Sequence, residues 1–103
     1  MKKIEAIIQL SKLNEVQDAL AEIGIDAMTV CEVKGFSRQH RHKETYRSQE
    51  HTLNFLPMIK IDLVVADEIV EPAVKIFIQS AKTGPSGEGK ILVSEVQEAA
   101  YAF

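Results

Sequence analysis

Apolar and polar residues recur with two different periods near the start of the chain, and this predicts a strand followed by a helix. Residues 3–10 alternate between apolar and polar positions, the pattern of a strand with one well-buried face. Residues 13–23 then repeat apolar side chains at helical spacing. Ser11 suits the start of this helix as a cap, and Gly24 suits its end.

Two further strands are predicted on either side of a long polar stretch. Residues 28–36 (MTVCEVKGF) and residues 56–66 (LPMIKIDLVVA) are rich in apolar and β-branched side chains. Between them, residues 37–54 contain only two large apolar side chains, Tyr46 and Leu53. We therefore expect an antiparallel strand pair with a long loop at its tip, since loops of this length are typically functional or mobile.

The second half of the chain repeats the alternation of helix and strand. Residues 70–81 have helical spacing, and Asp67 is a candidate cap for this second helix. Pro72 is tolerated only near the first turn of a helix, which favours a start later than Asp67. A glycine-rich turn then leads to a fourth strand at residues 91–93, and residues 95–103 are predicted to form a short helix.

The resulting order is strand, helix, strand, strand, helix, strand, which is the ferredoxin-like βαββαβ arrangement of an α+β sandwich. A chain of 103 residues is one domain, residues 1–103. Both helices would cover one face of an antiparallel sheet. Because every predicted strand carries apolar residues on both sides, we expect the other face to be covered by further copies in a homo-oligomer.

The long loop carries a local excess of positive charge. Residues 34–47 contain five Lys or Arg and one acidic residue, although the net charge of the chain is −3. This mild overall charge does not favour nucleic-acid binding. We therefore interpret the loop as a protein-partner surface, with these candidate contact residues: Arg41, His42, Tyr46, Arg47 and His51.

Composition places the chain among cytoplasmic globular proteins. Apolar residues make up 46% and charged residues 26%, and no apolar run is long enough for a membrane span. The start MKKIEAIIQLSK lacks the apolar core and cleavage site of a signal peptide. The single cysteine, Cys31, excludes an internal disulfide and is predicted to be a small core residue.

The glycine-rich turn at residues 82–90 partly matches a phosphate-binding motif. Gly84, Gly89 and Lys90 have the spacing of a P-loop, but Ile91 replaces its Ser/Thr, and the turn runs from helix to strand. The chain is therefore not a P-loop NTPase. Backbone N–H groups of the turn could still bind a phosphate, and the alternative is a plain connecting turn.

No catalytic or metal-binding constellation is visible in the sequence. His40, His42 and His51 lie in the basic loop, but no Cys or carboxylate cluster completes a metal site around them. We therefore predict no metal site. No nucleophile and base have the spacing of a catalytic pair, so the chain is not expected to be an enzyme.

The chain resembles the P-II signalling proteins in MKKIEAII, LAEIG, FLP, VVAD and TG..G.GKI, at matching positions along nearly its whole length. The resemblance implies a trimer that binds adenine nucleotides between subunits. It also implies that residues 37–54 are the T-loop, which docks on transporters or enzymes of nitrogen metabolism, and that residues 82–90 are the B-loop. The nucleotide-binding residues implied are Gly35, Arg38, Gln39, Val64, Thr83, Gly87, Glu88, Gly89 and Lys90.

Several positions depart from the family pattern. The tyrosine that the family modifies falls on His51, so uridylylation is not expected there. A lysine that pairs with 2-oxoglutarate falls on Met58, two arginines near nucleotide phosphates fall on Tyr101 and Phe103, and an aspartate falls on Glu88. The resemblance therefore implies an adenine nucleotide (ADP, AMP or ATP) as ligand, does not favour 2-oxoglutarate, and leaves magnesium open.

Two classes of function follow. The favoured class is a regulatory protein that senses a nucleotide and controls a transporter or enzyme in nitrogen utilisation, reaching a membrane only through a transporter partner. Its ligand or pathway could instead be divergent, as in inorganic carbon or metal transport. The other class is a non-sensing structural or metal-binding trimer that uses the three histidines.

Overall fold

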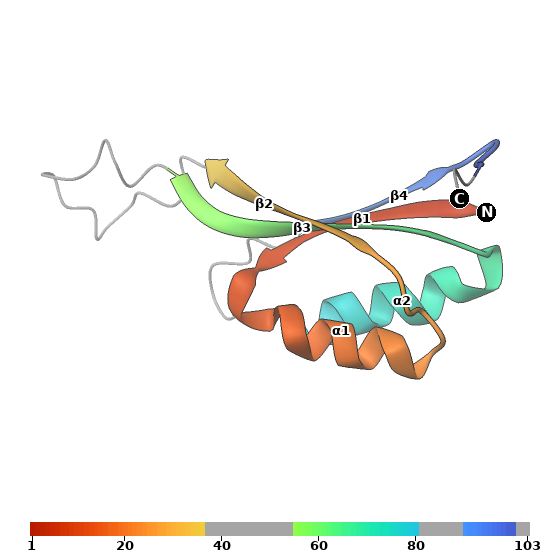
Figure 1. Cartoon of the computed structure of the whole chain (residues 1–103), viewed down its shortest axis with the longest axis horizontal. Coiled ribbons are helices and arrows are strands. Elements are labelled where there is room, and N and C mark those ends of the chain that lie inside the picture. Colours follow the sequence, from red (N-terminus) through yellow and green to blue (C-terminus); the bar gives the residue numbers. More distant parts are fainter. Residues whose placement is uncertain (37–54, 81–89, 101–103) are drawn as a thin grey trace, which may run out of the picture.

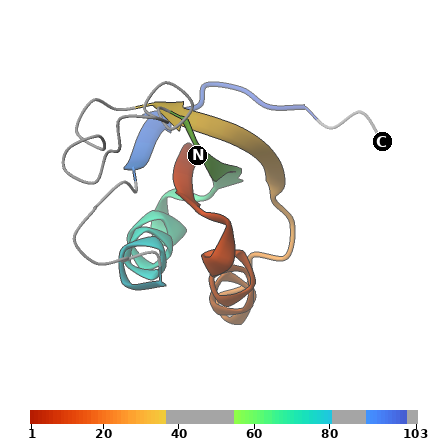
Figure 2. The same cartoon turned by 90° about the vertical axis from the view of Figure 1, so that its left-hand side faces the viewer.

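The computed structural model describes residues 1–36, 55–80 and 90–100. In these residues it has a four-stranded sheet in the order β2-β3-β1-β4, with antiparallel neighbours. Both helices lie on one face of the sheet, as predicted (Figures 1 and 2). The elements are β1 (Lys2–Gln9), η1 (Leu10–Lys12), α1 (Leu13–Glu22), β2 (Thr29–Phe36), β3 (Phe55–Val65), α2 (Asp67–Ser80) and β4 (Lys90–Glu95).

The core lies between the central strand β1 and the two helices. Strand β1 pairs with β3 on one side and with β4 on the other, and its alternate residues point into the core. This confirms the alternation predicted for residues 3–10. The largest fully buried side chains of the core are Phe77, Ile4, Ile8, Leu20, Ile59, Ile61 and Val16.

The start of α1 differs from the prediction. Ser11 lies inside the short 3-10 helix η1, and α1 follows directly with Lys12 at its N-cap position, where no side-chain hydrogen bond is made. The predicted Ser11 cap is therefore wrong, because η1 continues into α1 and leaves no extended residue between them. The predicted end is correct, since Gly24 has φ +93°, a conformation that glycine adopts without steric cost.

Helix α2 starts at Asp67, so the expectation that Pro72 delays its start is wrong. Pro72 is the sixth residue of the helix, and its missing N–H leaves only the carbonyl of Glu68 without a helical donor. Glu68 is exposed in the first turn, where water can replace that donor. The Ile69 N–H donates to the carbonyl of Ala66 at 2.9 Å, which closes the first turn ahead of the proline.

The end of the described chain is extended rather than helical. Strand β4 runs from Lys90 to Glu95, longer than the predicted 91–93, and residues 96–100 form no helix. The short helix predicted over residues 95–103 is therefore wrong in its described part, and residues 101–103 lie outside the described residues. The cause is continued pairing with β1, because the Val96 N–H donates to the carbonyl of Met1 at 3.2 Å.

Two neighbouring residues of α2 test this packing. Replacing Phe77, which is 0% exposed, by alanine should lower the free energy of unfolding by about 3–5 kcal/mol through lost burial and a cavity. The matched change Ile78→Ala, at a residue 53% exposed, should cost less than about 1 kcal/mol. Urea denaturation followed by circular dichroism measures both, and equal losses would contradict the assigned core face.

Candidate functional site

The predicted nucleotide-binding residues fall at both ends of the sheet. Gly35 lies near the end of β2 that leads into residues 37–54, the loop end. Lys90 starts β4, but it lies in the row of Ile7 and Lys60, midway along β3 between the partner of Gly35 and Val64. Val64 lies at the opposite end, beside Met1 and the start of α2. The other predicted site residues lie outside the described residues: Arg38, Gln39, Arg41, His42, Tyr46, Arg47, His51, Thr83, Gly87, Glu88 and Gly89.

The separation between these residues follows from the strand register. Gly35 is paired with Leu56, and Val64 lies eight residues farther along the same strand β3. At a rise of about 3.3 Å per residue, Gly35 and Val64 are about 26 Å apart along the sheet. One protomer therefore does not bring these two predicted residues together. An open cavity of about 470 Å³ lies beside Val64 and is also lined by Met1, Asp67 and Glu68.

The face of the sheet away from the helices carries apolar residues from every strand, as predicted, but also rows of charged residues that were not predicted. Residues paired across strands share a face, so the register defines these rows. Lys60 and Lys90 lie in one row with Ile7 between them. Asp62 and Glu5 lie directly opposite each other in the next row.

Asp62 is the least satisfied group of this open face. Its Oδ1 atom is buried and has no hydrogen-bond partner among the described residues. The Lys3 Nζ lies 4.0 Å from this oxygen and 3.9 Å from Glu5 Oε1, too far for a hydrogen bond to either. Like charges directly opposite in a sheet are destabilising. The long ion pairs of Lys3 with both carboxylates offset this repulsion only in part.

Cys31 also lies on the open face and is not a core residue. It is exposed and is paired with Lys60 on the edge strand β2, which contradicts the predicted core position. The physical reason is parity: Val30 pairs with the core residue Ile61, so its neighbour Cys31 must point to the opposite face.

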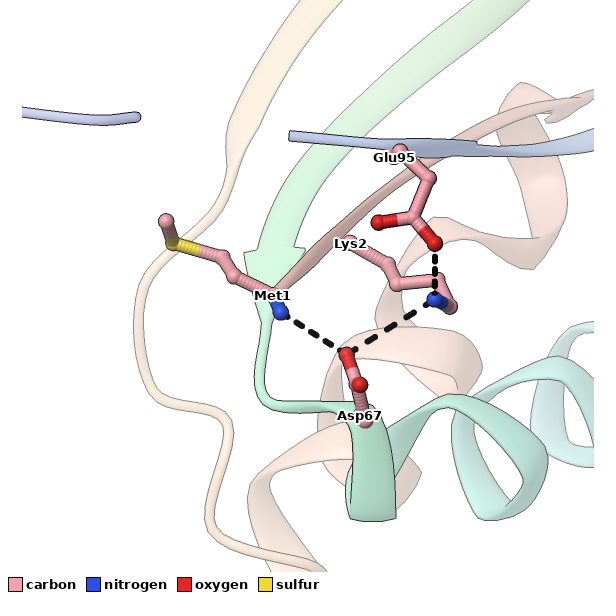
Figure 3. Close-up of polar contacts among 4 residues, drawn as sticks. All are labelled: Met1, Lys2, Asp67 and Glu95. Atoms are coloured by element: carbon pink, nitrogen blue, oxygen red, sulfur yellow. Dashed lines mark hydrogen bonds and ion pairs between the residues drawn. The ribbon is translucent and has the colours of Figure 1, made fainter. Parts of the chain in front are cut away.

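Three ion pairs among four charged groups join the chain start to α2 and β4 (Figure 3). The Met1 amino group donates to Asp67 Oδ1 at 2.8 Å, and Lys2 Nζ lies 2.6 Å from Glu95 Oε2 and 3.8 Å from Asp67 Oδ1. The hydrogen bond from the terminal amine, helped by the charge of Lys2, lowers the pKa of Asp67. The hydrogen bond to Glu95 raises the pKa of Lys2.

Sequence reasoning missed the open-face charges, although a signal was present. Lys3 and Glu5 alternate along β1, and Lys60 and Asp62 alternate along β3, all on the parity opposite to the core residues. The charged residues of the open face would have been found by asking on which side of each strand they lie, instead of by counting the apolar residues of the strand.

The described residues hold no group of three or more His, Cys, Asp or Glu side chains that could bind a metal ion. Within the same residues, no helix is long and apolar enough to cross a membrane. The three histidines considered as metal ligands, His40, His42 and His51, lie outside the described residues.

The protein has the strand order of a ferredoxin-like α+β fold, with both helices on one face of the sheet. A long connection joins β2 and β3. The sequence matches the family described as Nitrogen regulatory protein P-II over residues 1–102, and the chain belongs to this family, whose members are signalling regulators and not enzymes.

Curated relatives agree with the family match. The chain is 54% identical over 96 residues to Nitrogen regulatory protein P-II of Klebsiella oxytoca, covering 93% of this chain and 86% of the relative. It has the same identity and coverage with Nitrogen regulatory protein P-II 1 of Escherichia coli strain K12. The P-II protein of Bradyrhizobium diazoefficiens is 50% identical over 99 residues, 96% of this chain and 88% of the relative.

The ion pairs of Asp67 predict a pH-dependent contribution to stability. Because its pKa is lower in the folded chain, Asp67 stabilises the fold above its ordinary value of 3.8, and this contribution is lost as the pH falls through the folded pKa. The variant Asp67→Asn should therefore be less stable than the parent at neutral pH, and the difference should shrink in acid.

Urea denaturation at a series of pH values measures this difference. Glu71→Gln is the control, since it removes a carboxylate of α2 that makes no ion pair with a described residue. A stability difference for Asp67→Asn that stays constant down to strong acid would contradict the assigned ion pair.

Proposed function

We propose that this protein is a homotrimeric nucleotide sensor of nitrogen utilisation that controls a transporter or enzyme through residues 37–54. Membership of the nitrogen regulatory P-II family supports the regulatory role. The observation that carries the finer proposal is the division of the predicted nucleotide residues between the two ends of the sheet.

A site that uses both ends must be built between copies. Gly35 and Val64 are about 26 Å apart along one sheet, longer than an extended nucleoside triphosphate. The end of one sheet that carries Gly35 would then meet the end of another sheet that carries Val64. In such a contact Lys90 supplies a cation for phosphate, and the cavity beside Val64 supplies room for a base. The proposed nucleotide residues remain those implied by the family resemblance.

The charge rows of the open face favour further copies of the same chain as its cover. A buried carboxylate oxygen without a partner is costly, and a cation from another molecule offsets that cost. The row of Lys60 and Lys90 on one copy is complementary to the row of Glu5 and Asp62 on another. Exposed Leu92 and Val64 on the same face add apolar area to such a contact.

The partner contact is proposed for the loop because of its position and charge. Strands β2 and β3 run antiparallel up to Phe36 and Phe55, so residues 37–54 connect the outer end of the strand pair. The basic residues counted in the sequence favour an acidic surface on the partner, whether transporter or enzyme.

Charge reversal on the open face tests trimer and nucleotide site together. Asp62→Lys places a cation beside Lys60 and should dissociate the assembly, because like charges then meet across the contact. Sedimentation equilibrium should show about three times the 11.5 kDa chain mass for the parent and the single chain mass for the variant. Calorimetry with ADP should show binding to the parent and loss of binding to the dissociated variant.

The double variant Lys60→Asp/Asp62→Lys exchanges the two charges and should restore part of the assembly and of ADP binding. Glu22→Lys, an exposed charge reversal on α1, is the control and should change neither. A parent chain that is monomeric, or a dissociated variant that binds ADP with unchanged affinity, would contradict the divided site.

The ligand response should differ from that of family members that bind 2-oxoglutarate. Met58 stands where the family lysine is expected, is 5% exposed and carries no charge. Loss of one charged partner costs about 2–5 kcal/mol, which weakens binding by one or more factors of ten. Calorimetry with magnesium, ATP and 2-oxoglutarate together should show weak or no 2-oxoglutarate binding, while ADP still binds.

Met58→Lys tests the cause of the loss. It should recover part of the 2-oxoglutarate affinity if the missing cation sets the limit, with circular dichroism as a check that the buried lysine is tolerated. Tight 2-oxoglutarate binding by the parent chain would refute the proposed loss.

A further inference from the structure

A small groove is lined by residues of η1, β2 and β3. In Figure 1, β2 and β3 extend past the helix layer towards the loop end. The volume of the groove is about 280 Å³. Ile59 belongs to the core face, so its cross-strand partner Glu32 points to the same side, and Lys34 and Pro57 form the next pair on that side. The groove is lined by Leu10, Glu32, Val33, Lys34, Pro57, Met58 and Ile59.

The lining is apolar inside and charged at one rim. Leu10 and Ile59 belong to η1 and β3, whereas the charged residues Glu32 and Lys34 both come from the edge strand β2. Glu32 and Lys34 are exposed and lie two residues apart on the same side of the strand, about 7 Å between their Cα atoms. Neither takes part in an ion pair with a described residue.

We propose that this groove binds a free apolar α-amino acid such as leucine. The aliphatic side chain enters between Leu10, Pro57 and Ile59, the ammonium group faces Glu32 and the carboxylate faces Lys34. An α-amino acid carries both charges on one carbon beside an apolar chain, which is the combination that this lining presents. Neither a fatty acid nor an amine alone would use both rim residues.

The size and place of the groove agree with this class of ligand. Pockets that bind drug-sized ligands have volumes of about 300–1,000 Å³. A groove of about 280 Å³ is smaller than these pockets and suits a single amino acid. Lys34 and Pro57 each lie two residues from a strand end that leads into residues 37–54. The groove is distinct from the proposed nucleotide site and does not depend on it, since it uses neither Gly35, Val64 nor Lys90.

Isothermal titration calorimetry of the full chain with L-leucine provides the test and should show saturable binding. Exposed ion pairs contribute little, so Glu32→Gln and Lys34→Gln should each weaken leucine binding about two- to fivefold. Lys75→Gln, an exposed change on α2, is the control and should leave the affinity unchanged.

Analogues separate the possible occupants. 4-Methylpentanoate lacks the ammonium group and 3-methylbutylamine lacks the carboxylate, so each should bind more weakly than leucine. Equal binding of N-acetyl-leucine amide, which carries neither charge, would overturn the proposal and assign the groove to an apolar side chain of a partner protein. The absence of saturable binding heat up to the solubility limit of leucine would also overturn it. ADP titration of the same samples reports on the nucleotide site separately.

Discussion

The register between β1 and β3 is the constraint on which the rest of the structure depends. Ile4 pairs with Leu63, and Ala6 pairs with Ile61, so the inward residues of both strands meet on the helix side. A shift of one residue would turn every one of these side chains to the open face, which makes the register costly to change. Because β1 also pairs with β4, the same register fixes the position of the last strand.

The same register gives the open face its rows of charge. Glu5 must stand opposite Asp62 once Ile4 and Ala6 stand opposite core residues of β3. Core packing therefore imposes a repulsion between two carboxylates, which Lys3 offsets in part through its ion pairs with both of them. Two carboxylates side by side are tolerated where solvent or another molecule supplies cations. The core and the open face are thus two consequences of one pairing, which also leaves the buried Oδ1 of Asp62 without a hydrogen-bond partner among the described residues.

Element order and the core were predictable from the sequence because they depend on local periodicity. The alternation of residues 3–10 and the helical spacing of residues 13–23 each identify a buried face without tertiary information. The boundaries were less predictable, because they depend on contacts with distant residues. Val96 stays extended through its bond to Met1, which a sequence window around residue 96 cannot reveal.

The candidate site shows the same division between local and distant information. Cys31 was assigned to the core from an apolar neighbourhood, but its side is decided by the pairing of Val30 with Ile61. Likewise the groove combines Leu10 with Glu32 and Ile59, three positions that only the folded sheet brings together. Motif matching could name Gly35, Val64 and Lys90, yet it carried no information on their separation.

That separation has a consequence for how such a protein can respond to a ligand. The loop end and the terminal end of one sheet are joined by strands with continuous backbone pairing, which hold Gly35 and Val64 at a fixed distance. A ligand that contacts both kinds of end cannot draw them together within a protomer, so it must instead bind across a contact between copies. For the proposed divided site, ligand binding and assembly would stabilise each other by mass action, since that site would exist only in the assembled form. The paired strands thus set the geometry that any such contact between copies must match.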